Sequence, residues 1–421
     1  MRKILSVLIA AALCLISIFA LPACGKRGDD LIVWWVSGQK TEQIINEAVA
    51  AFKADNPGKG VRVVSKPGMD VFQAYKIALG DDKTRPDVAI LDHVYVPALA
   101  RDGLIADLSA LGSESVKDKY PEGLYNASAY NGKAYGLPLS ANTVALMYNK
   151  NILKAAGVTD DGTVNGNVAA PSTLDELYAA CEKVKAIGKT PFAQPINSFA
   201  AMVFMSYIGR LGANIVSSDY KTITIGTDLP VKTALEKWKY FTDNGYAVKT
   251  DFEEGKFYTG QVAFVEMGSW NISKVSGAGA LFECGFTEMV TIDPALPNYS
   301  GLGLWSLAVA EKSTDKAAAY KLAEYLSTDT KVQVEFNKER GVFPVTHDAL
   351  SNVHYTSDPI LATYASQLQK AFPRPGTPVW PDLELILVTM LRSAVLNGNT
   401  DAALAAAQAS AQQATNRLYG L

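Results

Sequence analysis

The sequence predicts an α/β fold in which mostly parallel sheets are flanked by helices. Its length of 421 residues, at about 150 residues per domain, suggests two or three domains. Apolar residues make up 48% and charged residues 19%, which excludes a disordered chain. Short runs of β-forming residues alternate with segments of helical periodicity, the pattern typical of α/β proteins. The net charge of −3 lacks the basic excess of a nucleic-acid binder, so we expect no nucleic-acid partner.

The first 23 residues have the features of a bacterial export signal. Arg2 and Lys3 precede an uncharged run, Ile4–Ala23, which ends in small residues as secretory signals do. The sequence Leu-Pro-Ala-Cys-Gly at 21–25 resembles a lipobox, which implies cleavage before Cys24 and lipidation of its thiol. An ordinary cleaved signal and a retained anchor are the alternatives, since the run is long enough to span a bilayer. If the chain is cleaved and lipidated at Cys24, residues 24–30 form a polar tether.

Strands and helices alternate regularly through the first hundred residues of the mature chain. Strands are expected at 31–36, 61–64 and 87–91, and helices at 44–52, 72–79 and 96–101. The first helix is expected to stop at Asn56-Pro57-Gly58, because these residues disfavour its continuation. In such sheets ligands lie at the carboxyl ends of the strands, which is where Ser37, Gly38 and Asp92 fall.

A second α/β unit is expected farther along the chain. Residues 132–139 are punctuated by Gly and Pro and predict a pair of extended segments, and a strand follows at 143–148. Pro171-Ser172-Thr173 predicts the capped start of a helix. The chain should end in two helices, 382–396, which stops at Asn397-Gly398, and 400–418, which Thr400 caps.

Motifs for catalysis, metals and cofactors are largely absent from the sequence. It contains no nucleophile elbow, no Walker A motif and no complete dinucleotide-binding fingerprint. The histidines are His93, His347 and His354, and neither an HExxH nor a CxxC pair is present. We therefore expect no cofactor, no metal site and no catalytic residues, although a glycosidase pair of carboxylates is not excluded by sequence.

The two cysteines of the mature chain beyond Cys24 are Cys181 and Cys284. An oxidising compartment would permit a disulfide between them. Cysteine is among the most buried residue types, so we expect two separate core thiols.

Tryptophans provide the most suggestive candidates for ligand contacts. Trp270 and Trp305 follow glycine-containing segments, and Trp380 lies in the sequence Pro-Val-Trp-Pro. Core packing accounts for most single tryptophans, but an indole ring beside glycine in a loop offers a flat apolar face and an N–H donor, which suits a sugar ring. Trp34 and Trp35 alternate along the first strand, so at most one of them is expected to meet a ligand.

Four motifs, in order along the chain, resemble those of the bacterial extracellular solute-binding proteins, family 1, which include maltose-binding protein. Two of them are GKAYGLPL at 132–139 followed by ALMYNK at 145–150, and TGQVAFVEMGSW at 259–270. The others are Pro86-Asp87-Val88 with Gly103-Leu104-Ile105, and GVFPV at 341–345. The resemblance spans most of residues 31–418.

The resemblance implies a two-lobed periplasmic-binding-protein fold of type II character. Each lobe is then a mostly parallel sheet flanked by helices, and several strands join the lobes as a hinge. Lobe 1 would comprise 31–140 with 288–340, and lobe 2 would comprise 141–287 with 341–421. The crossings would lie near Ser140, Met289 and Gly341.

The resemblance also places candidate binding residues. Trp35, Ser37, Gln39 and Lys40 match the first strand-to-helix loop, and Asp92 and His93 match the loop after the third strand. Trp270 matches a ring that stacks on sugar. Asn142 occupies the hinge position at which maltose-binding protein has a Glu. Val388 lies near the position of the C-terminal Trp that stacks on sugar in maltose-binding protein, so Trp380 is the candidate that could replace that Trp. Trp305 completes the set of candidates through its place after a glycine-containing segment, since the resemblance does not assign it. These departures argue against maltodextrin specificity.

The resulting hypothesis is a monomeric, lipid-anchored lipoprotein of an ABC importer that is exported, binds a sugar between its lobes and delivers it to the permease subunits. It would be attached to the membrane only through acyl chains, such as palmitate, on Cys24. Two alternatives remain. The first is a charged ligand: the cations Lys40, Arg374 and Arg392 would suit glycerol phosphate, whereas an acidic cleft would suit a polyamine. An exported carbohydrate-active hydrolase would instead present a pair of carboxylates to the cleft.

Overall fold

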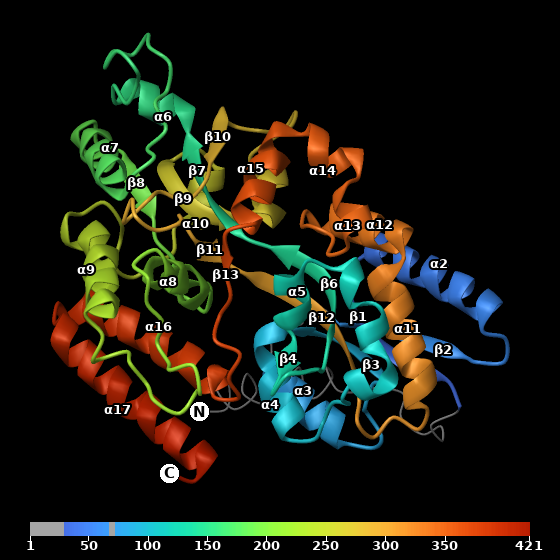
Figure 1. Ribbon diagram of the computed structural model, residues 1–421. Coiled ribbons are helices and arrows are strands. Elements are labelled where there is room, and N and C mark those ends of the chain that lie inside the picture. Colours follow the sequence, from blue (N-terminus) through green and yellow to red (C-terminus); the bar gives the residue numbers. More distant parts are fainter. Residues whose placement is uncertain (1–28, 67–71) are drawn as a thin grey trace, which may run out of the picture.

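The computed structural model describes residues 29–66 and 72–421. Its longer strands form two separate sheets, each covered by helices, and Figure 1 shows them as the centres of two lobes. The predicted signal segment and Cys24 lie outside the described residues. Within the described ranges, no helix combines the length and the apolar character needed to cross a membrane.

The first sheet consists of β1 (Leu31–Val36), β2 (Val61–Lys66), β3 (Val88–Asp92), β6 (Leu137–Asn142) and β12 (Gly303–Val309), in the spatial order β2-β1-β3-β12-β6. Strand β1 pairs in parallel with β2 and β3, whereas β12 pairs antiparallel with β3 and β6. The sheet is therefore parallel apart from β12. All of β1 is buried, as expected for an apolar strand covered on both faces.

Helices cover this sheet, and three of them lie where the periodicity predicts a helix. The helix α2 (Gln39–Asp55) buries Ile44, Ala48 and Phe52 against the sheet and ends at Asn56. The other helices of this lobe are α3 (Phe72–Gly80), α4 (Val96–Arg101), α5 (Glu122–Asn126), α11 (Lys316–Thr328) and α12 (Thr330–Arg340), and the short strands β4 (Ala129–Tyr130) and β5 (Lys133–Ala134) form a hairpin. A 3₁₀ helix, η2 (His93–Tyr95), which the sequence did not predict, joins β3 to α4.

The second sheet consists of β7 (Val144–Asn149), β8 (Thr190–Ala193), β9 (Val262–Gly268) and β10 (Cys284–Thr287), in the order β10-β7-β9-β8. Strand β7 runs antiparallel to β9 and β10, while β8 and β9 are parallel. Around it lie α6 (Lys150–Ala155), α7 (Leu174–Ala186), α8 (Phe199–Gly209), α9 (Leu229–Asp243), α10 (Glu254–Tyr258), α14 (Val353–Ser357) and α15 (Pro359–Leu368). The short helix α13 (His347–Leu350) packs on α12 of the first lobe. Thr173 and Glu176 form a capping box at the start of α7, which confirms the predicted capped helix.

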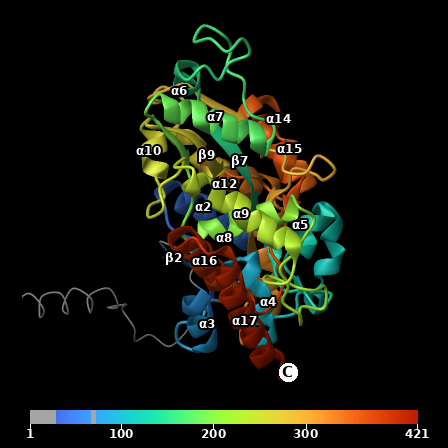
Figure 2. The ribbon, with the colours of Figure 1, turned by 90° about the vertical axis from the view of Figure 1, so that its left-hand side faces the viewer.

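The last two helices form an antiparallel pair. They are α16 (Trp380–Asn397) and α17 (Thr400–Tyr419), and Gly398 ends α16 with a φ of 73°, a left-handed conformation that glycine adopts without strain. The cap of α17 is Asn399, whose side chain accepts a hydrogen bond from the Ala402 amide, and not Thr400 as predicted. The pair packs on α8 and α9, as Figure 2 shows, and so belongs to the second lobe.

The chain crosses between the lobes at several points. Strand β6 ends in the first sheet at Asn142 and β7 begins in the second at Val144, so Thr143 alone separates them. The Thr143 hydroxyl donates to the Gly301 carbonyl at 3.2 Å, and the Val144 amide donates to Ser300 Oγ at 3.0 Å. These bonds tie this crossing to the one that returns through β11 (Ser300–Gly301), which pairs with β13 (Ala371–Phe372).

The two cysteines of the described chain are free thiols. Cys181 is fully buried in α7, as predicted for a core thiol. Cys284 lies in β10 and is only partly buried. Burial raises the pKa of both thiols, so neither thiolate is favoured.

Candidate functional site

A cavity of about 350 Å³ lies between the two lobes. The first lobe contributes the ends of β3, β6, β12 and α12, and the second lobe contributes the start of α8, the turn after β9 and the segment around the start of α16. Polar, aromatic and charged side chains all reach it. The residues that line it are Asp92, Tyr95, Ser140, Asn142, Ser198, Phe199, Met202, Trp270, Gly303, Leu304, Trp305, Arg340, Val342, Arg374 and Glu384.

Trp270 owes its position to the glycine two residues earlier. A Cβ at Gly268 would fall 1.8 Å from the Trp270 ring, so only glycine lets the indole fold back over the end of β9. Phe199 of α8 meets this ring edge to face, with the centroids 6.0 Å apart. The indole is therefore fixed in orientation and half-buried, with part of its surface toward the cavity.

The opposite lobe supplies a second indole and an amide. Trp305 lies in β12, and the Arg340 guanidinium lies 4.9 Å above its ring, a cation–π contact. Asn142 faces Gly303 across the β6–β12 pair, and a Cβ at Gly303 would lie 2.1 Å from the Asn142 Oδ1 atom. The glycine thus makes room for the amide beside Trp305.

Asp92 and Arg374 form the charged part of the cavity. One guanidinium nitrogen of Arg374 lies 3.0 Å from each carboxylate oxygen of Asp92. Burial by itself would raise the pKa of Asp92, but the Arg374 charge and the His93 hydrogen bond outweigh it and hold this pKa well below its ordinary value. Asp92 is therefore an anion at neutral pH, and Arg374 neutralises its charge.

His93 orients Asp92 from behind and does not line the cavity. Its Nδ1 atom lies 2.9 Å from Asp92 Oδ1 and 3.2 Å from the Leu304 carbonyl oxygen. Since both neighbours are acceptors, we assign the ring proton to Nδ1. Burial lowers the pKa of His93 despite the nearby Asp92 carboxylate, so the ring is neutral at pH 7.

Of the predicted binding residues, Asp92, Asn142, Trp270 and Trp305 meet in the cavity. Trp35 and Trp380 do not. Trp35 is 0% exposed, packs on Phe336 with the ring centroids 4.8 Å apart, and donates its indole N–H to the Thr41 carbonyl oxygen at 3.2 Å. Trp380 is also 0% exposed. Both rings are packing residues, because the inward side of a buried strand or helix is filled by core.

The loop between β1 and α2 also lies away from the cavity. Ser37 is half-exposed, and Gln39 and Lys40 are exposed at the start of α2. Lys40 contacts Gln43 through a 3.3 Å hydrogen bond on the same helix. The loop that follows β1 thus lies at the surface in this structure, while the end of β3, which is nearer the middle of the sheet, reaches the cavity.

Several cavity residues were missed by the sequence reasoning. Phe199 and Met202 come from α8, whose residues from Ala200 to Gly209 are all buried, so its composition indicates only core. Arg340 lies at the last turn of α12 and Glu384 in the first turns of α16, where charged residues are usual. No local pattern distinguishes these side chains from ordinary surface or core residues.

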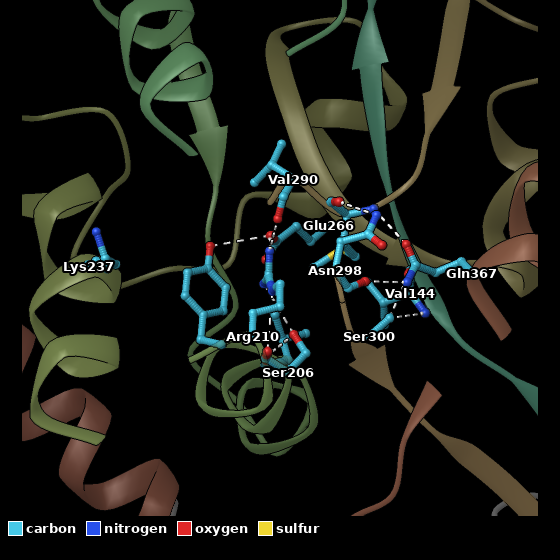
Figure 3. A network of polar contacts seen from close by, with 12 residues as sticks. Val144, Ser206, Arg210, Lys237, Glu266, Val290, Asn298, Ser300 and Gln367 are labelled. Atoms are coloured by element: carbon cyan, nitrogen blue, oxygen red, sulfur yellow. Dashed lines mark hydrogen bonds and ion pairs between the residues drawn. The ribbon is translucent and has the colours of Figure 1, made fainter. Parts of the chain in front are cut away.

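A buried ionisable network supports β9, the strand that leads into the turn with Trp270. Glu266 of β9 accepts a hydrogen bond from the Tyr207 hydroxyl at 3.3 Å, and the Arg210 guanidinium lies 3.8 Å from the same carboxylate. Figure 3 shows Arg210 and Glu266 close together in this network. Arg210 also donates to the Val290 carbonyl at 2.7 Å. Burial raises the pKa of Glu266 to about 7, against the opposing effects of Arg210 and Tyr207. The network lies outside the residues that line the cavity.

Comparison with known proteins identifies the family. The family model described as "Bacterial extracellular solute-binding protein" matches residues 47–363. The chain belongs to this family. Among curated relatives, this solute-binding protein is 25% identical to the maltotriose-binding protein of Pyrococcus abyssi, over 83% of this chain and 74% of that protein. It is 24% identical to the galactooligosaccharide-binding protein of Bacillus subtilis, over 90% of each chain.

Solved structures show the same two-lobed fold for the solute-binding protein. The cyclic α-maltosyl-1,6-maltose binding protein of Arthrobacter globiformis superposes with a TM-score of 0.79 at 23% identity, covering 92% of this chain and 99% of that one. The sugar-binding protein MalE of Xanthomonas citri gives a TM-score of 0.78 at 20% identity, covering 93% and 98%. In the described part of the solute-binding protein, no group of three or more His, Cys, Asp or Glu residues is placed to hold a metal ion.

Proposed function

We propose that this solute-binding protein captures a carbohydrate in the cavity between its lobes and delivers it to the permease of an ABC importer. The observation that carries the proposal is the pairing of aromatic and polar groups in that cavity. Trp270 and Trp305 offer flat apolar rings from opposite lobes, and Asn142 lies beside them. A sugar ring has apolar C–H faces and hydroxyl edges, so it matches both kinds of group.

The charges in the cavity favour a neutral ligand. Asp92 and Arg374 neutralise each other, and the remaining charged side chains, Arg340 and Glu384, are of opposite sign. The other cations weighed for a phosphorylated ligand lie elsewhere, since Lys40 and Arg392 are exposed on helices and do not line the cavity. Neither glycerol phosphate nor a polyamine has a specific contact in its favour.

A binding role without catalysis is also part of the proposal. A hydrolase would need one cavity carboxyl group to act as a general acid. The cavity is lined by two carboxyl groups, Asp92 and Glu384, and Asp92 is unsuited to this role, because its ion pair with Arg374 keeps its pKa low. The family and the printed names of its relatives, which bind maltotriose and galactooligosaccharide, support binding as the activity.

We assign the lobes as 31–142 with 302–340 and 144–300 with 341–421, which moves two of the expected boundaries to the crossings at Thr143 and near Ser300, and these crossings act as a hinge. Closure of the lobes on the ligand follows if the ligand contacts both of them. Export and anchoring through a lipid on Cys24 complete the proposal, because capture at the membrane surface keeps the protein near its permease.

A thermal-shift screen of the mature protein against neutral sugars and polyols tests this function. A ligand at 100 times its Kd adds about 2.7 kcal/mol of stability, which is readily seen as a rise in Tm. Glycerol phosphate and spermidine serve as the charged comparison. A rise in Tm with a charged compound and with no sugar would contradict the proposal, as would steady hydrolysis of a bound sugar by the pure protein.

A further inference from the structure

Two polar contacts bridge the lobes at the wall of the cavity. Asp92 and Tyr95 belong to the first lobe, at the end of β3 and in η2. Of their partners, Arg374 lies in the segment that leads into α16 and Glu384 lies in the first turns of α16, which packs on α8 and α9 of the second lobe. Arg374 contacts both oxygens of Asp92 at 3.0 Å, and the Tyr95 hydroxyl donates to Glu384 Oε2 at 3.5 Å.

The Asp92–Arg374 bridge sets the distance between the lobes in the arrangement that the structure shows. Both side chains are largely buried, at 16% and 5% exposure, so water does not replace either partner easily. Arg374 lies between Pro373 and Pro375, whose rings restrict the backbone of this segment. On the other side, His93 holds Asp92 in place through its Nδ1 proton. The lobes cannot move apart at this wall without separating a buried ion pair.

The cavity that these bridges delimit is small. Its volume of about 350 Å³ lies near the lower end of the range of roughly 300–1,000 Å³ for small-molecule pockets. We infer that the two interlobe bridges act as a spacer that restricts the ligand to one or two sugar rings. This inference rests on the proposed carbohydrate function and adds a size limit to it.

The wild-type protein tests the size limit directly. Calorimetric titration with neutral mono- and disaccharides that raise the Tm is compared with titration of tetrasaccharides built from the same sugars. We expect the tetrasaccharides to bind at least about tenfold more weakly, a difference of about 1.4 kcal/mol. Tighter binding of the tetrasaccharide would overturn the size limit but not the carbohydrate function. Failure of every sugar to bind would overturn both.

The double variant Asp92→Asn/Arg374→Met tests whether the bridge sets the limit. It removes both charges together, so neither is left unpaired. It also nearly conserves side-chain volume, and the Asn carbonyl oxygen still accepts from His93. If the bridge is a spacer, the ratio of tetrasaccharide to disaccharide affinity should rise by about tenfold relative to wild type. If the two residues are only ligand contacts, both affinities fall together and the ratio stays constant, which would overturn the inference.

A surface ion pair provides the matched control. Lys150 and Glu283 are 2.6 Å apart and lie in the second lobe, away from the cavity. The variant Lys150→Met/Glu283→Gln should leave the affinity ratio unchanged. If the cavity variant proves poorly folded, Tyr95→Phe removes the hydroxyl of the second bridge alone, and the same ratio should shift in the same direction by a smaller factor. An unchanged ratio in that folded variant would also overturn the spacer role.

Discussion

Replacing Trp270 by alanine should weaken ligand binding far more than it weakens folding. The ring is half-buried and packs edge to face on Phe199, with its remaining surface toward the cavity. Stacking on a sugar contributes about 0.5–1.5 kcal/mol, and burial of the ring by the ligand adds about 1.5–3 kcal/mol. The expected loss is about 2–4 kcal/mol, or roughly 30- to 1,000-fold in Kd.

The effect on stability should be smaller than for a core tryptophan. Truncation of a fully buried Trp costs about 3–5 kcal/mol of folding free energy. Trp270 is only half-buried, so it makes fewer packing contacts than a fully buried Trp. Trp238 is the matched core residue, since it is 1% exposed and meets Phe204 and Tyr207 edge to face. Trp238→Phe should lower the Tm and leave the affinity near the wild-type value.

Affinity and Tm should be measured on the same preparations, by calorimetric titration with a sugar identified in the screen and by thermal unfolding. The pattern expected is a large change in Kd for Trp270→Ala and a large change in Tm for Trp238→Phe. A large drop in Tm for Trp270→Ala with an unchanged Kd would refute the reasoning. It would mean that Trp270 supports the packing around α8 and makes no contact with the ligand.

Three further outcomes are expected. Cys24→Ala should move the protein from the membrane to the soluble fraction, because acyl chains held by about 0.8 kcal/mol per buried CH₂ would be lost; an unprocessed, membrane-bound variant would favour a retained anchor. Saturating sugar should reduce the radius of gyration in small-angle scattering, since the ligand favours the closed form, and an unchanged radius would indicate a rigid cleft. Burial raises the pKa of Glu266 from 4.5 to about 7, so its contribution to stability is complete below about pH 4.5 and is lost as the pH rises through about 7. Glu266→Gln should remove this decline, worth up to roughly 3 kcal/mol, and equal slopes of unfolding free energy between pH 5 and pH 8 in both proteins would contradict it.

The local elements of the fold were predictable because each leaves a periodic signal. The apolar run of β1, the helical spacing of Ile44 and Phe52 in α2, and the Thr173 cap of α7 all recur in the structure. The cap of α17 was misplaced by one residue, since Asn399 and Thr400 are adjacent and both side chains are good N-caps. The 3₁₀ turn at His93 was missed because a segment of three residues is too short to show a hydrophobic periodicity.

The sequence by itself determined the family, through four motifs in order, and the position of Trp270, through the small residues that precede it. It could not determine which other candidates meet in the cavity. Trp35 and Trp270 both have neighbours that suit a ligand, yet Trp35 packs on Phe336, three hundred residues away.

Tertiary structure alone decided the composition of the cavity. The bridge between Asp92 and Arg374 joins residues 282 positions apart, and Phe199 reaches the ligand side only because α8 begins where the lobes meet. Hydrophobic periodicity records whether a residue is buried, but it carries no information on which element lies opposite. The path of the chain, which crosses between the lobes at Thr143 and again near Ser300, sets those distant contacts.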